Sequence, residues 1–97
     1  MASAMNNGVA DADNAAAAAQ RAEEEKLSRL QRAAERVCTL ILVTDIPAVD
    51  IAIERRQARE LCQRLFPDRI DLFELIYESR FERLWRQFRT EPSWRDF

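Results

Sequence analysis

The chain has 97 residues, which is enough for at most one domain. Its 15 basic and 17 acidic side chains give a net charge of −2, so a continuous basic stripe for a nucleic-acid backbone is not expected. One glycine and three prolines offer few tight turns, which disfavours a β fold rich in hairpins. We therefore predict an all-α protein.

The first 26 residues are not expected to join a core. Residues 1–13 are small, polar and acidic, so they bury too little to offset the entropy of ordering, and we predict a disordered N-terminal segment. Residues 14–26 are rich in alanine and glutamate, which favour helix, and none of them is large and apolar. They predict an exposed helix extension that begins at Asn14, a suitable capping residue.

The helical domain is predicted to span residues 27–89, and its first helix carries an apolar stripe. Spacings of three and four place these side chains on one face: Leu27, Leu30, Ala34, Val37 and Ile41. Residues 40–43 then carry apolar side chains on every side of the helix. A strand over residues 37–43 is an alternative because β-branched residues gather there, but it would have no partner strand.

Two prolines divide the rest of the domain. Pro47 predicts a second helix over residues 47–66, with Asp45 as its cap. Pro67 predicts a third helix over residues 68–89, with Arg86 and Arg89 at its negative end. The expected architecture is a small three-helix bundle, or a helical hairpin plus a third helix.

The C-terminal tail, residues 90–97, carries two aromatic side chains, Trp94 and Phe97. It either folds back on the bundle or waits for a partner.

The third helix carries more large apolar side chains than one buried face needs. A wheel at 100° per residue gathers a core face of Ile70, Phe73, Tyr77, Phe81, Leu84 and Phe88, with Trp85 at its margin. A second cluster lies roughly opposite and consists of Leu72, Leu75 and Ile76. The turn between the first two helices adds Leu42, Val43, Ile46, Val49 and Ile53. Since a domain of about 60 residues is marginally stable alone and large exposed apolar patches usually mark interfaces, we predict that these two sets bind a partner.

The residues that most chemistry requires are missing. There is no histidine, the usual general acid or base, and the two cysteines cannot supply the four or so nitrogen and sulfur ligands of a zinc site. The single glycine excludes a glycine-rich phosphate loop. Glu74, Glu78 and Glu82 have the spacing of a bridging metal site, but arginines surround them and a solvated charged face is expected. We predict no enzyme, no cofactor and no metal.

The sequence also bears on location. The N-terminus lacks the basic and apolar regions of a secretion signal, and Asp11 and Asp13 are untypical of a mitochondrial presequence. Residues 40–43 form the longest run of large apolar side chains, far short of the roughly 20 residues that span a bilayer. We expect an intracellular protein, cytoplasmic or nuclear, with no membrane span. Cys38 and Cys62 are expected to be buried free thiols.

Two functions remain open from the sequence. The first is a non-enzymatic helical protein–protein interaction module, either self-associating or a small subunit of a larger complex. The alternative is a small helical nucleic-acid-binding regulator that uses Arg55, Arg56, Arg59 and Arg64. On the wheel Arg56 points away from Arg55 and Arg59, and neighbouring glutamates dilute the positive charge, so the alternative is the weaker one.

Overall fold

A computed structural model describes residues 2–43 and 45–90 of the chain. Its elements are α1 (Ala2–Leu42), α2 (Ala48–Leu65), a 3₁₀ turn η1 (Pro67–Arg69), α3 (Ile70–Phe73), a π-helical turn η2 (Glu74–Glu78) and α4 (Ser79–Phe88). No strand occurs in the described ranges, which confirms the all-α prediction and excludes the alternative strand over residues 37–43.

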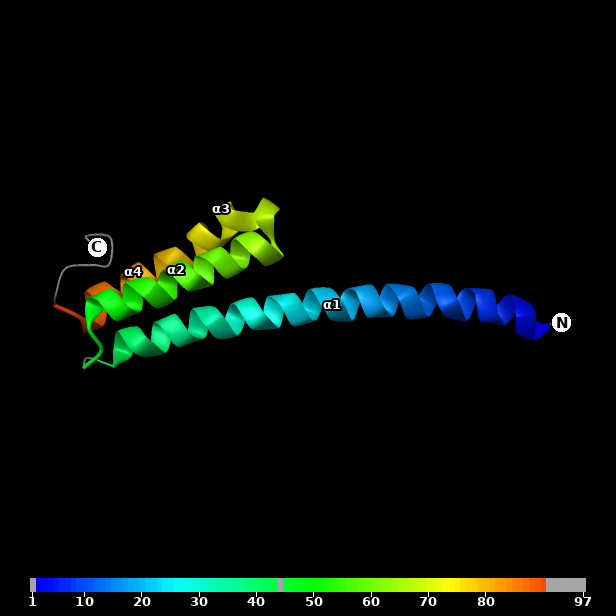
Figure 1. Cartoon of the computed structure of the whole chain (residues 1–97), viewed down its shortest axis with the longest axis horizontal. Coiled ribbons are helices and arrows are strands. Elements are labelled where there is room, and N and C mark those ends of the chain that lie inside the picture. Colours follow the sequence, from blue (N-terminus) through cyan, green and yellow to red (C-terminus); the bar gives the residue numbers. More distant parts are fainter. Residues whose placement is uncertain (1, 44, 91–97) are drawn as a thin grey trace.

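The helices form a three-helix bundle at one end of a long helix (Figure 1). α1 packs against α2 and α4, and α2 packs against η1 and α3. α2 is antiparallel to α1, and the segment from η1 to α4 runs parallel to α1 (Figure 1). Since α1 continues well past the bundle, the molecule measures 71 × 23 × 18 Å.

Helix α1 begins at Ala2, before the expected start at Asn14. Asn6, Asn7 and Gly8 in these first turns are poor helix formers, so the early start of the helix does not contradict the predicted disorder of residues 1–13. In Figure 1 this half of α1 projects beyond the bundle, with no other described element beside it. Helices without packing partners are only marginally stable in water, so these turns are the least stable part of α1.

The core lies between the three helices and uses one face of each. α1 contributes Leu30, Ala34, Val37, Cys38 and Ile41, α2 contributes Ile51, Ala52, Ala58 and Cys62, and the returning segment contributes Phe73, Phe81 and Trp85. The Phe73 ring packs against those of Tyr77 and Phe81, with centroids 5.4 and 6.4 Å apart. Leu27, expected on the buried stripe, is 45% exposed because it lies where α1 leaves the bundle.

The two proline breaks occur where the sequence predicts them, but their details differ. Pro47 itself occupies the N-cap position of α2, in an extended conformation, and no side chain caps this helix. The prediction of Asp45 as the cap is therefore wrong, because Asp45 lies two residues before the cap position. At the other end, the amide of Phe66 bonds the Cys62 carbonyl at 2.7 Å and α2 stops before Pro67.

The third helix is not continuous, which changes its buried face. η2 is a wider π turn between α3 and α4 and contains one additional residue. The side chains that follow it are therefore rotated by about 100° around the helix axis, relative to their positions in a continuous α-helix. Trp85, expected at the margin, is 3% exposed, whereas Phe88, expected on the core face, is 51% exposed. The same rotation turns Glu78 inward, where it is 6% exposed.

Arg89 closes the open end of the bundle. α4 ends there because the Arg89 backbone is extended, and its guanidinium packs over the Trp85 ring at 5.1 Å. The guanidinium donates to the carbonyls of Leu40 at 3.0 Å, Ile41 at 2.9 Å and Ile46 at 2.7 Å, and to that of Val43. The sequence predicted that Arg89 would stabilise the negative end of its own helix. In the structure its side chain instead bonds the last carbonyls of α1.

Candidate protein-interaction surface

Seven of the eight predicted partner-binding residues are exposed, and they lie in two separate places. At the turn between α1 and α2, four side chains are 43 to 48% exposed, namely Leu42, Val43, Val49 and Ile53. We call these four residues the tip. At the other end of the bundle, Leu72, Leu75 and Ile76 are 50%, 69% and 55% exposed. Ile46 does not belong to either set, since it is partly buried and packs against the core.

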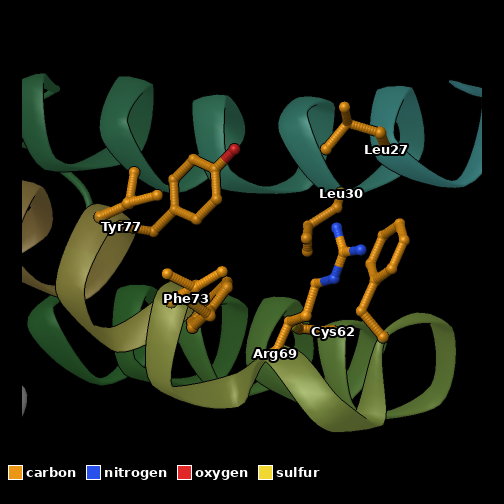
Figure 2. A pocket seen from close by; sticks show the side chains of 9 residues that line it. Leu27, Leu30, Cys62, Arg69, Phe73 and Tyr77 are labelled. Atoms are coloured by element: carbon orange, nitrogen blue, oxygen red, sulfur yellow. The ribbon is translucent and has the colours of Figure 1, made fainter.

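An apolar groove lies between α1 and the segment formed by α3 and η2 (Figure 2). Two of the predicted residues, Leu72 and Ile76, line it, and α1 provides Leu27 and Leu30 from the opposite side. The remaining lining residues are Cys62, Phe66, Arg69, Phe73 and Tyr77. Leu75 is not among them. The helical wheel therefore located part of this surface, and the structure adds a second wall from α1.

The size of the groove decides what it can hold. Its volume is about 190 Å³. A cavity of about 150 Å³ accepts benzene, while sites for small-molecule ligands usually measure about 300–1,000 Å³. The groove is therefore large enough for one leucine- or phenylalanine-sized side chain and small for a typical metabolite. Apolar pockets at protein interfaces receive the central anchor residues of the partner.

The polar groups of the groove are few. Of the nine described residues that line it, Arg69 alone is charged, and its guanidinium packs over the Phe66 ring at 5.7 Å. Figure 2 shows Tyr77 directing its hydroxyl towards α1. Burial raises the pKa of the Tyr77 phenol, with a smaller opposing effect of Arg80, so this hydroxyl stays protonated and can donate a hydrogen bond.

The glutamates of the third helix have a structural role. Glu78 pairs with Arg55 of α2 at 3.1 Å, and Glu74 pairs with Arg59 at 2.6 Å. The expectation of a solvated face is wrong for Glu78, because the π turn rotates it towards α2. The sequence carries a sign of these pairs. Arg55 and Arg59 have the same four-residue spacing as Glu74 and Glu78, and two antiparallel segments bring Arg55 to Glu78 and Arg59 to Glu74. No group of three potential metal ligands occurs in the part of the chain that the structure describes.

The two cysteines offer no accessible chemistry. Cys38 and Cys62 are both buried and free, as predicted. Burial raises the pKa of both thiols, so the protonated, weakly reactive form prevails at neutral pH.

Comparisons with protein-family models, with curated proteins and with solved structures find no match for this chain. Within residues 2–43 and 45–90, no helix has both the length and the apolar character needed to cross a bilayer.

Proposed function

We propose that this protein is a helical protein–protein interaction module that acts without enzymatic chemistry, and that the groove is its binding site. The partner presents an apolar side chain from a helix, and it is either a second copy of the chain or another subunit of a complex. The observation that supports this most is the apolar groove, whose walls come from two different parts of the chain.

Three groove residues, Leu27, Leu72 and Ile76, are each about half exposed in the isolated chain. Covering the exposed half of three such side chains contributes on the order of 3 kcal/mol, and a buried anchor side chain adds about 1.5–3 kcal/mol. This sum is below the roughly 8 kcal/mol of a micromolar complex. The partner must therefore also contact surfaces beside the groove, and Leu75, at 69% exposure, is the nearest candidate in the sequence.

A charge placed in the groove tests the proposal. Ile76→Glu would bury an unpaired carboxylate at the contact, at a cost of several kcal/mol, and should weaken association by orders of magnitude. Gln57→Glu is the matched control, since it adds the same charge at an exposed position of α2. Light scattering should give a wild-type mass above 11.3 kDa, a control like the wild type, and a smaller Ile76→Glu variant with unchanged helical circular dichroism.

If the wild type is a monomer, the proposal predicts a different protein as partner. A pull-down should then retain a protein with the wild type and with Gln57→Glu, and lose it with Ile76→Glu. A monomer that retains no such protein would contradict the proposed function. Loss of helicity in Ile76→Glu would show that this side chain supports the fold itself.

The nucleic-acid alternative gains no support from the arrangement of its arginines. Arg55 and Arg59 are engaged by Glu78 and Glu74, which neutralises half of the predicted basic set. Arg56 and Arg64 are exposed on α2. A salt-dependent mobility shift with DNA or RNA would nevertheless favour this alternative over a protein partner.

A further inference from the structure

We infer that the partner at the groove is a second copy of this chain, packed antiparallel on the outer face of the segment from η1 to α4. The inference rests on the proposed function, because Leu72 and Ile76 of this face also form one wall of the groove. All residues of the outer face belong to the described part of the chain, whereas the predicted tail over residues 91–97 lies outside it.

The outer face consists of two rows of exposed side chains, each with a spacing of four residues. One row is Asp68, Leu72, Ile76 and Arg80, and the other is Asp71, Leu75, Ser79 and Arg83. Four residues make slightly more than one α-helical turn but less than one π-helical turn, so the π turn η2 offsets the drift of the rows around the segment. Both rows therefore stay on the side opposite the buried rings of Phe73, Phe81 and Trp85.

The charges along this face are complementary to a second, antiparallel copy of the same face. Each row begins with an aspartate, continues with large apolar side chains and ends with an arginine. An antiparallel pair brings Asp68 and Asp71 of one copy opposite the arginines of the other, while the apolar side chains meet in the middle. A parallel pair would place aspartate against aspartate and arginine against arginine, which is unfavourable. The charge pattern thus selects both the partner and its orientation.

The register of the contact follows from the same pattern. Asp68 and Arg83 are equally far in sequence from the midpoint between residues 75 and 76, and so are Asp71 and Arg80. A twofold axis at this midpoint therefore brings Asp68 to Arg83 of the second copy and Asp71 to Arg80. Since a contact between two identical faces repeats each pair, charged pairs flank the apolar centre on both sides.

The side chains of this face are available for the contact. The two aspartates and the two arginines are exposed, and none of them forms an ion pair with another residue that the structure describes. Glu74 and Glu78 of the same segment are instead paired with α2. Leu75 is the most exposed large apolar side chain of the described residues and does not line the groove. It lies at the centre of the proposed contact, so one second copy covers it together with the groove wall.

Charge reversal tests this arrangement in the full chain. Static light scattering gives a mass independent of shape and should show the wild type at twice 11.3 kDa. Asp68→Lys/Asp71→Lys and Arg80→Glu/Arg83→Glu should each raise the dissociation constant of the dimer by about 100-fold or more, because like charges then face each other. An equimolar mixture of the two variants should be dimeric again, since opposite charges then face each other at both ends of the contact.

Control variants separate this face from the rest of the surface. Arg32→Glu/Arg56→Glu makes the same change of charge as the arginine variant at exposed positions of α1 and α2, and it should stay dimeric. Ile53→Glu, in the tip at the other end of the bundle, should stay dimeric as well. If the lysine variant loses its helical circular dichroism, Asp68→Asn/Asp71→Asn should still weaken the dimer several-fold, because it removes the same charges without reversing them.

The inference and the proposed function fail in different ways. Folded reversal variants that stay dimeric, or a mixture that stays monomeric, would overturn the antiparallel arrangement, whereas a monomeric Ile76→Glu would still support the groove as the interface. Loss of the dimer in Ile53→Glu would show instead that the tip of one copy docks on the next. A monomeric wild type would overturn the inference outright, and the pull-down with Ile76→Glu would then decide whether the groove binds a different protein.

Discussion

Arg89 shows how one side chain can complete a bundle. Helix ends leave their last carbonyls without partners, and here the guanidinium fork of a distant residue satisfies those of Leu40, Ile41 and Val43, together with Ile46 in the turn. Arginine presents five donors in a fixed plane, which lysine cannot reproduce. The sequence could not reveal this role, because it joins residues more than 40 positions apart.

Arg89→Ala should lower the free energy of unfolding by about 3 kcal/mol or more, since hydrogen bonds to charged groups contribute about 1.5–3 kcal/mol each and several carbonyls would lose their partner. Arg89→Lys should recover part of this loss. Arg86→Ala, at an exposed position of α4, is the control and should stay within about 0.5 kcal/mol of the wild type in urea unfolding. Equal effects of the two alanine substitutions would contradict the capping role.

The buried thiols predict how stability depends on pH. Burial raises the pKa of Cys38 and Cys62 above the ordinary value of 9.0, so the folded state keeps protons that the unfolded state releases. The stability contributed by this difference is complete below pH 9 and is lost as the pH rises above it. The melting temperature should therefore fall above pH 9, and less steeply for a Cys38→Ala/Cys62→Ala variant. The same slope in both proteins would assign the loss to other groups.

At the scale of the elements, the π turn η2 is the feature that local reasoning missed. The prolines at 47 and 67 act on their immediate neighbours, so the sequence predicts both breaks and the all-α class. The π turn instead coincides with tertiary contacts, since the two residues that bound it, Glu74 and Glu78, pair with arginines of α2. A helical wheel with a constant 100° per residue therefore placed the side chains after the π turn on the wrong faces of the helix.

The burial of two phenylalanines tests whether the third helix follows the helical wheel or the observed structure. Both belong to the predicted core face, but Phe81 is fully buried and Phe88 is 51% exposed. Phe81→Ala should cost about 3–5 kcal/mol, the usual range for a buried phenylalanine. Phe88→Ala should cost about 1 kcal/mol or less, because half of its surface is already in water. Urea unfolding of the two variants measures both values, and similar losses would argue for an uninterrupted α-helix.

At the scale of the whole molecule, the candidate site was predictable in part. Leu72 and Ile76 were identified because they oppose the core face on the wheel. Leu27 and Tyr77 were assigned to the core, since periodicity shows which side chains share a face and not where a neighbouring helix ends. The groove lies between α1 and the segment of α3 and η2, near the point where α1 leaves the bundle, and only the packed structure shows this arrangement.

The projecting part of α1 should add helix without adding stability. Removal of residues 1–13 should leave the melting temperature nearly unchanged, because the described part of the chain places no element beside them. The helical circular dichroism should decrease by at most the share of those residues. A fall of many degrees in the melting temperature would show that this segment packs against the protein and that the predicted boundary near residue 13 is wrong.

The projecting helix also governs how the protein moves through solution. The radius of gyration is 19.6 Å, whereas a compact domain of this length has about 13 Å. A single copy must therefore tumble and diffuse like a considerably heavier globular particle. On a size-exclusion column calibrated with globular standards it would elute early, as a dimer would. Elution volume thus cannot separate a rod from a pair, and a shape-independent mass is required to decide whether the groove joins two copies.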